Sequence, residues 1–329
     1  MATLRDIAKA VGVDISTVSK VLQGAPIRVS DERRSAILRV AEEMKYRPNM
    51  VARGLRLGRS GAIAMPVPST ANYLYPEIIG GAEDAAERLG YVLFVLKQSA
   101  SDPLGRVLNI VDQGRVDGLI FADDAPTPEF LDALSEHRVP FISLNKGSDT
   151  DRNCVTLDDR SGFAKQAAYL SELGHRKVAF VRVTPISFTS EFCLGAFEER
   201  LEPSWVWECG FFGDGVESVA DRYMASDRPT AIATASVVVA ARLVQSLLSR
   251  GVRVPEDVSV IGYHDSPIAQ WPPPGVTTVR MPSREQGCRA VEALRELIET
   301  GSFAGETISS PPEIVERGSC TAPRVGRPA

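Results

Sequence analysis

The chain opens with Thr3–Leu22, TLRDIAKAVGVDISTVSKVL, and this stretch decides the fold of the first domain. Thr3 precedes Asp6 by three residues, which is the spacing of a capping box at the start of a helix. Gly12 ends that helix, and Asp14 is placed to cap a second helix whose inward residues are Val18, Val21 and Leu22. Two short helices joined by a glycine-containing turn predict a helix-turn-helix unit.

The second helix is expected to expose a mixed polar and apolar face made of Ile15, Ser16, Ser19 and Lys20. A third helix is predicted after its cap, Ser30, with two acidic residues in its first turn that complement the helix dipole. Its expected apolar stripe consists of Ile37, Leu38, Ala41 and Met44. A small three-helix domain that binds no nucleic acid would fit the same pattern.

Charge separates this head from the rest of the chain. Residues 1–60 hold 9 Arg and 3 Lys against 6 Asp and Glu, a net charge of +6. The whole chain carries −5, so residues 61–329 carry −11. A basic head on an acidic body favours a nucleic-acid-binding domain attached to a domain that does not contact phosphates.

Motifs along the chain resemble one protein family. Besides Thr3–Leu22, they are Tyr46–Asn49 (YRPN), the run from Ala52 to Ser60, Val116–Ile120 (VDGLI), Glu172–His175 (ELGH), Pro255–Val260 (PEDVSV) and Thr277–Val279 (TTV). In this order they resemble the lactose-repressor (LacI-type) family of bacterial transcription regulators. The resemblance covers essentially the whole chain, and the motifs are specific together although none is specific alone.

The composition bounds the class of protein. The 329 residues are enough for one large or two medium cores beyond the head. No apolar run approaches the roughly 18 residues that a membrane helix needs. Arg5, Asp6 and Lys9 interrupt any signal-peptide core, so we expect a cytoplasmic protein without a membrane partner. The five cysteines form no C-x-x-C pair and the three histidines show no ligand spacing, so we expect free thiols, no metal and no cofactor.

The sequence shows no catalytic group. The G-x-S-x-G, P-loop and G-x-G-x-x-G signatures are absent. Asp123 and Asp124 could suggest acid–base chemistry, but neighbouring carboxylates at a strand end are more often loop caps or solvated groups. We therefore expect that the protein is not an enzyme.

Residues 48–59 are expected to link head and body. Pro48 suits the first turn of a short helix, but Gly54 costs roughly 1 kcal/mol against alanine, and so short a helix is marginal alone. We therefore expect a segment that is unfolded in the free protein and helical on DNA; the alternative is a passive tether. The resemblance implies a hinge helix in the minor groove with a leucine pushed between base pairs, and the matching positions are Asn49, Ala52, Leu55 and Arg56.

From residue 62 onward, short apolar runs alternate with amphipathic helices. The predicted strands are Ala62–Val67, Tyr91–Lys97, Gly118–Ala122, Pro140–Leu144, Lys177–Val183, Val206–Phe211, Ala231–Ala235 and Val258–Gly262. The predicted helices are Tyr75–Leu89, Pro103–Gln113, Pro128–His137, Gly162–Leu173, Ser190–Leu201, Glu217–Ala225 and Val237–Ser249. Such alternation predicts an α/β body of two lobes, each a doubly wound parallel sheet with helices on both faces. Ligands bind outside the carboxyl ends of such strands, so a cleft between the lobes is expected.

The resemblance adds the connections between the lobes. It implies the periplasmic-binding-protein architecture, with crossovers near residues 157, 280 and 305. The head would then be residues 1–47, the hinge 48–59 and the body 60–329, with a first lobe of about 60–157 and 280–305 and a second of about 158–279 and 306–320. The helix Arg284–Glu299 would return to the first lobe, and Glu313–Gly318 would end in the second. The chain after Ser319, CTAPRVGRPA, lacks the apolar heptads that tetrameric relatives need, so a homodimer is expected.

The resemblance also assigns DNA contacts in the head. Ile15, Ser16 and Lys20 match the positions that reach base edges in the major groove. Lys20 stands where many relatives carry arginine, so it offers a single donor group rather than a two-pronged one. The candidates for phosphate contacts, which position the head without specifying sequence, are Thr17, Ser19, Ser30 and Arg33.

The expected cleft departs from the family pattern. Sugar-binding relatives place an arginine where this chain has Phe192, an Asn-Asp pair where it has Ser236-Val237, and an Asp-Asp pair where it has His264-Asp265. Polar readers of hydroxyls have thus been exchanged for aromatic and apolar groups. The predicted effector contacts are Tyr73, Tyr75, Asn145, Phe192, Phe212, Ser236 and Asp265.

The sequence therefore predicts a dimeric transcription regulator, a repressor of a pseudo-palindromic operator on double-stranded DNA. A small-molecule effector bound between the lobes would control it, and that effector is expected to be no simple neutral sugar. Two alternatives stay open. One is a cytoplasmic ligand-binding protein without a DNA function, which leaves the basic head unexplained; the other is a regulator whose cleft no longer binds an effector.

Overall fold

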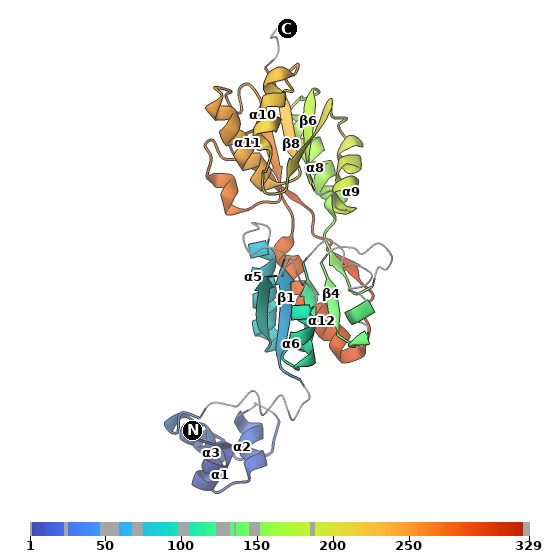
Figure 1. The fold of residues 1–329 in the computed structure, drawn as a ribbon. Helices are drawn as coiled ribbons and strands as arrows, with labels where there is room; N and C mark the ends of the chain where they lie inside the picture. Colours follow the sequence, from blue (N-terminus) through green and yellow to red (C-terminus); the bar gives the residue numbers. More distant parts are fainter. Residues whose placement is uncertain are drawn as a thin grey trace. The chain divides into compact units, whose positions relative to one another are not determined.

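The computed structural model describes residues 2–22, 26–46, 59–67, 75–97, 105–122, 132–134, 136–144, 152–184 and 188–324, with the side chains of 188–192 excepted. The chain divides into two compact units, residues 1–60 and 61–329 (Figure 1).

The first unit contains the three predicted helices, α1 (Leu4–Val11), α2 (Ile15–Leu22) and α3 (Asp31–Glu43). The predicted capping box is present: Thr3 and Asp6 satisfy each other's backbone N–H groups at the start of α1. Ser30 caps α3, and Gly12 takes the left-handed conformation, with φ of 70°, that ends α1. The three helices enclose a small core made of Ile7, Ala8, Val18, Val21, Ile37 and Ala41.

The predicted apolar stripe of α3 is only half correct. Ile37 and Ala41 are buried, but Leu38 is 49% and Met44 39% exposed. Ile37 and Ala41 are four residues apart and share a face, whereas Leu38 is turned about 100° away from Ile37. Met44 is the C-cap of α3, at the end of the helix, and does not belong to the small core.

The second unit begins with a four-stranded parallel sheet in the order β2-β1-β3-β4. The strands are β1 (Ala62–Val67), β2 (Val92–Lys97), β3 (Gly118–Phe121) and β4 (Phe141–Ser143), all at predicted places. Helices α5 (Tyr75–Leu89) and α12 (Ser283–Thr300) pack on one face, and α6 (Gly105–Asp112) with residues 132–134 on the other. The rest of the helix predicted at Pro128–His137 lies largely outside the described residues.

Helix α12 comes from far along the chain and is locked onto α5 by two glycines. A Cβ on Gly81 would lie 1.9 Å from the carbonyl oxygen of Arg284, and one on Gly287 would lie 1.9 Å from that of Ile78. The two helix backbones thus touch at a spacing that only glycine permits. This contact fixes the place where the chain re-enters the first sheet.

The other sheet has six strands in the order β12-β10-β9-β8-β6-β7. The strands β6 (Val178–Thr184), β7 (Trp205–Gly210), β8 (Ala231–Thr234) and β9 (Ser259–Tyr263) match predictions within two residues. Helices α10 (Val216–Ala225) and α11 (Val237–Ser249) cover one face, and α8 (Asp159–Glu172) and α9 (Phe188–Glu198) the other (Figure 1). The two faces separate because side chains alternate along buried strands such as β6.

Three features of this unit were not predicted. Strand β10 (Thr277–Arg280) extends the sheet, and β12 (Glu313–Val315) pairs with it antiparallel, so the sheet is not purely parallel. Two-residue strands β5 (Val155–Thr156) and β11 (Glu306–Thr307) form a small sheet of their own. Such short pairs have no periodicity that a sequence could reveal.

Helices cover both faces of the first sheet, as predicted, but two apolar side chains of its edge strand β2 are exposed. Val92 is 56% and Phe94 47% exposed on this edge strand.

Among the helices that the structure describes, none combines the length and hydropathy needed to cross a bilayer.

Candidate nucleic-acid interface and effector site

The start of α2 is fixed by Asp14, as predicted. The backbone N–H of Ser16 donates to the Asp14 carboxylate at 2.7 Å. The hydrogen bonds from the side chain and backbone of Ser16 hold the pKa of Asp14 below its usual range. The helix that would enter a groove is therefore anchored at its first turn by a charged cap.

The predicted DNA contacts differ in exposure. Ile15 is 39% exposed, and Ser16, Lys20, Ser30 and Arg33 are also exposed, whereas Thr17 is half-buried. Ser19 is buried, 8% exposed, so its predicted exposure is wrong. It shares a helix face with half-buried Leu22, three residues on, which turns it toward the core. The hinge positions Asn49, Ala52, Leu55 and Arg56 lie outside the described residues.

In the second unit, the candidate effector residues lie where strands end. Strands β8 and β9 pair with Ala233 beside Ile261, so Ser236 and His264, each three residues further on, leave the sheet at the same edge. Ser236 is buried and caps α11: its hydroxyl accepts from the N–H of Val238 at 3.2 Å and donates to the Phe211 carbonyl at 3.4 Å. Its polar capacity is therefore used by the chain itself.

Of the aromatic candidates, Phe212 is exposed and Tyr75 is buried. Phe212 follows β7 and is 41% exposed, so its ring is available to a ligand. Tyr75 is buried at the start of α5, and its hydroxyl donates to the carbonyl of Ala122 at 3.0 Å. Tyr73 and Asn145, and the side chain of Phe192, lie outside what the structure describes.

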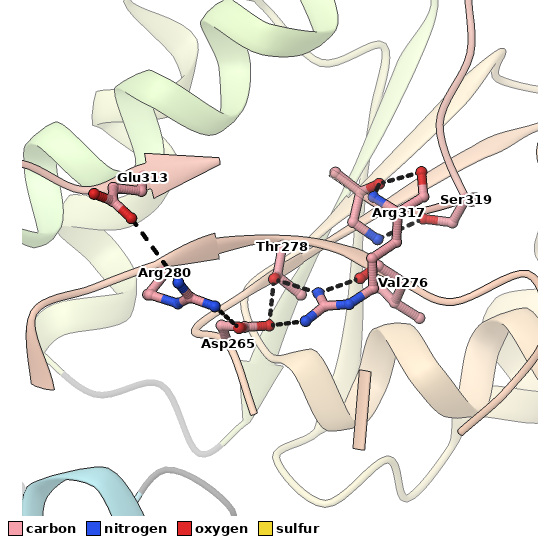
Figure 2. A network of polar contacts seen from close by, with 8 residues as sticks. Asp265, Val276, Thr278, Arg280, Glu313, Arg317 and Ser319 are labelled. Atoms are coloured by element: carbon pink, nitrogen blue, oxygen red, sulfur yellow. Dashed lines mark hydrogen bonds and ion pairs between the residues drawn. The ribbon is translucent and has the colours of Figure 1, made fainter. Parts of the chain in front are cut away.

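Asp265 follows β9 by two residues, and its carboxylate is held by three donors (Figure 2). Its Oδ1 accepts from the Thr278 hydroxyl at 2.7 Å and lies 2.9 Å from Nη2 of Arg317. Its Oδ2 accepts from Nη2 of Arg280 at 2.8 Å. Arg317 is fixed in turn, because it donates to the Val276 carbonyl at 2.9 Å and to the Thr278 hydroxyl at 3.1 Å.

These contacts decide the charge of Asp265. Burial alone would raise its pKa, but hydrogen bonds from Arg280 and Thr278 and the charge of Arg317 outweigh burial and hold the pKa below its usual value. An effector could use this carboxylate only by displacing a donor that the chain provides. The sequence contained both arginines but gave no sign that they meet this aspartate.

His264 was not among the predicted contacts. Unlike Asp265, it is uncharged and has a nitrogen without a hydrogen-bond partner. Its φ of 61° is left-handed, and its ring meets the Tyr263 ring edge-on with centroids 4.7 Å apart. Its Nδ1 is buried without a hydrogen-bond partner, as are the Ser266 hydroxyl and Oε1 of Gln166. Burial lowers the pKa of His264 to about 4, so the imidazole is neutral at physiological pH. The exchange of an acid for this histidine was visible in the sequence; its missing partner was not.

The described residues contain no group of His, Cys, Asp and Glu that could hold a metal ion. At the strand ends, the groups without a partner or open to solvent are the neutral His264 imidazole, the Ser266 hydroxyl and the Phe212 ring, which suit a small organic ligand.

Comparison with known proteins fits both parts of the chain. Residues 3–49 match "Bacterial regulatory proteins, lacI family", and residues 167–320 match "Periplasmic binding protein-like domain". The "HTH-type transcriptional repressor PurR" of Vibrio cholerae is 30% identical over 96% of this chain and 97% of its own. The chain belongs to the lacI family. It is accordingly a transcription regulator with a helix-turn-helix head and a periplasmic-binding-protein-like body.

Other lacI-family members agree over the full length. The "HTH-type transcriptional regulator DegA" of Bacillus subtilis is 29% identical over 96% of this chain and 97% of its own. The Lac repressor dimer bound to operator and the anti-inducer ONPF matches with a TM-score of 0.80 and 23% identity, covering 98% of this chain and 99% of that one. The regulator CelR in complex with cellobiose matches with a TM-score of 0.72 and 23% identity, over 97% of this chain and 100% of that one. At this identity the two structures confirm the predicted fold.

Proposed function

We propose that the protein is a homodimeric repressor that reads a pseudo-palindromic operator through α2 in the cytoplasm. The observation that carries this is the anchored helix α2, which exposes Ile15, Ser16 and Lys20 on a head of net charge +6. A two-fold dimer presents two such helices, so its site should contain two inverted half-sites. The four hinge positions named above stay predictions of minor-groove contact.

Selection of binding sites from random DNA by the full chain, followed by fluorescence anisotropy, tests this proposal. We expect an inverted repeat to emerge and its affinity to fall steeply with salt, because about 0.9 counterions are released per phosphate neutralised. A single asymmetric site, or equal affinity for all sequences, would contradict it. A ligand-binding protein without a DNA function would select nothing.

The two exposed apolar side chains of β2 support the dimer. Val92 and Phe94 point to the same side of an edge strand and are about half exposed. Exposed apolar edges of this kind are commonly covered by a partner, since they otherwise promote aggregation. We propose that a second copy of the chain covers this face.

The effector is proposed to be no simple neutral sugar and to bind among Tyr73, Tyr75, Asn145, Phe192, Phe212, Ser236 and Asp265. The polar groups of Tyr75, Ser236 and Asp265 already have partners in the chain, so sugar hydroxyls would stay unmatched, at roughly 1–3 kcal/mol each. Exposed Phe212 favours a flat ligand instead. Titration calorimetry with ribose and glucose tests this, and micromolar binding of either would contradict it.

A further inference from the structure

Residues 211–215, FFGDG, form the loop between β7 and α10, and we call them the aromatic loop. The loop closes on itself: the Gly213 N–H donates to the Gly210 carbonyl at 2.7 Å, and the Gly210 N–H donates to the Asp214 carbonyl at 2.7 Å. Gly213 has a φ of 85°, which residues with a side chain rarely adopt. These bonds fix the shape of the loop, but none of them involves the backbone of Phe212.

The backbone of Phe212 is held from outside the loop, by Arg242 of α11. Nη1 of Arg242 donates to the Phe212 carbonyl at 2.7 Å, and no other described residue forms a hydrogen bond with the backbone of Phe212. The stem of Arg242 lies against Gly213, because a Cβ on that glycine would come within 2.6 Å of Cδ and 3.1 Å of Nε. A glycine at this position therefore lets the arginine lie along the loop and reach the carbonyl.

The neighbouring residue, Phe211, is fixed by the core of the six-stranded sheet. Its ring packs against that core, its N–H donates to the Thr184 carbonyl at 3.2 Å, and its carbonyl accepts from the Ser236 hydroxyl at 3.4 Å. The Phe212 ring meets the Phe211 ring at 79°, with centroids 5.3 Å apart. The 41% exposed Phe212 ring is thus held by one edge-on ring contact and, through its backbone, by Arg242.

The charge of Arg242 is not used in an ion pair. Within the part of the chain that the structure describes, Arg242 forms no salt bridge, and Glu217, an acid whose pKa its charge helps to lower, pairs with Arg250 at 2.6 Å. A charged donor on a neutral carbonyl makes a stronger hydrogen bond than a neutral donor. The contact that Arg242 does make is therefore the one that fixes the aromatic loop.

We propose that Arg242 is a positioning residue for the effector: by holding the Phe212 carbonyl, it orders the exposed ring in advance as a platform for a planar aromatic ligand. Ordering a side chain or a loop opposes binding, so a ring that is held before the ligand arrives binds more tightly than a free one. The idea rests on the proposed effector site at Phe212. Arg242 acts through the backbone and needs no contact with the ligand.

Hydrogen exchange of the full chain without ligand tests the holding of the loop. Arg242→Ala should speed exchange of the hydrogen-bonded amides of Gly213 and Val216 about tenfold, as expected for the loss of one hydrogen bond from a charged donor. Arg242→Lys keeps a charged donor on a long stem and should restore most of the protection. Gln245→Ala is the matched control, because Gln245 is exposed on the same helix and the described residues show no hydrogen bond to it.

Unchanged exchange in Arg242→Ala would overturn the proposal, and so would an equal effect of Gln245→Ala. Equal effects of Arg242→Ala and Arg242→Lys would overturn it as well, because the donor would then not be what holds the loop.

Titration calorimetry with uracil, nicotinamide and benzoate tests the platform. At least one of these planar probes should bind, and Phe212→Leu should weaken its binding at least tenfold, as expected for the loss of a stacking ring. Phe212→Leu should leave exchange of the Gly213 amide unchanged, because leucine keeps the carbonyl that Arg242 holds. Arg242→Ala should weaken binding about tenfold, and Arg242→Lys less than about threefold.

Three results would overturn the platform: binding of none of the planar probes, undiminished binding in Phe212→Leu, or full affinity in Arg242→Ala. Failure of the wild-type chain to select an operator would instead refute the proposed function, and the exchange and calorimetry results would still stand, because neither uses DNA.

Discussion

Gly287 and Ile78 touch so closely that a Cβ on Gly287 would lie 1.9 Å from the carbonyl oxygen of Ile78. The reciprocal contact, from Gly81 to Arg284, makes the α5–α12 crossing a contact of two backbones. Since α12 is the only described helix that reaches the first sheet from beyond residue 280, this crossing determines how firmly the distant segment is held.

Gly287→Ala is expected to lower the free energy of unfolding by at least about 2 kcal/mol, because helices cannot separate without disturbing the core around them. Gly195→Ala is the matched control: it lies in α9, and its added Cβ would meet nothing within 4 Å. That change should stabilise the protein by up to about 1 kcal/mol through helix propensity. Urea unfolding measures both, and equal effects would contradict the close packing.

The sequence predicted much of this fold for physical reasons. Amphipathic helices such as α5 and α11 and the buried strand β1 were predicted with the observed bounds, because burial on a fixed face imposes a period. Strands β5 and β11 escaped prediction because two residues carry no period. The backbone contact between Gly287 and Ile78 could not be predicted, because a glycine in a sequence does not indicate which residue packs against it.

Lys20→Ala is expected to cost roughly 1–3 kcal/mol on the selected operator and to relax preference at one base pair per half-site. Lys20 is exposed in the last turn of α2, where its amine can reach a guanine edge. Lys9→Ala removes the same charge from exposed α1 and should weaken selected and random DNA alike. Anisotropy titrations compare the two, and equal losses on both DNAs for Lys20→Ala would show that it contacts only phosphate.

Phe94→Lys is expected to convert the proposed dimer into monomers at micromolar concentration, because a charge would have to be buried against the partner. Val206→Lys is the control, since Val206 is also an exposed apolar residue of an edge strand, 40% exposed on β7. Sedimentation velocity distinguishes the two. Monomers in both variants, or in neither, would show that the β2 face is not the interface.

The effector site was less predictable than the fold. The sequence placed Ser236 and Asp265 correctly after the ends of strands, but both side chains form hydrogen bonds with other residues of the chain. Hydrogen-bond partners come from segments such as Thr278 and Arg317, and their distance in sequence hides them. His264 stood in the same motif, but only the buried, unpartnered nitrogen distinguishes it from Asp265.

His264 also predicts a pH dependence of stability. Burial lowers its pKa from 6.5 to about 4 in the folded chain. Between these values the unfolded chain binds a proton that the folded chain does not, so the free energy of unfolding falls as pH drops. The contribution is complete above about pH 6.5, and about 1–2 kcal/mol of it should be lost by pH 5.

His264→Gly removes this titration and relieves the left-handed strain, which is independent of pH. The variant should therefore lose less stability than the wild type between pH 7 and pH 5, while the buried His175, whose pKa burial also lowers, contributes equally to both. Urea unfolding at the two pH values gives the difference, and NMR of the His264 ring nitrogens follows its protonation directly. Parallel stability curves, or a titration midpoint of His264 near 6.5, would show that the imidazole is solvated and not held neutral by burial.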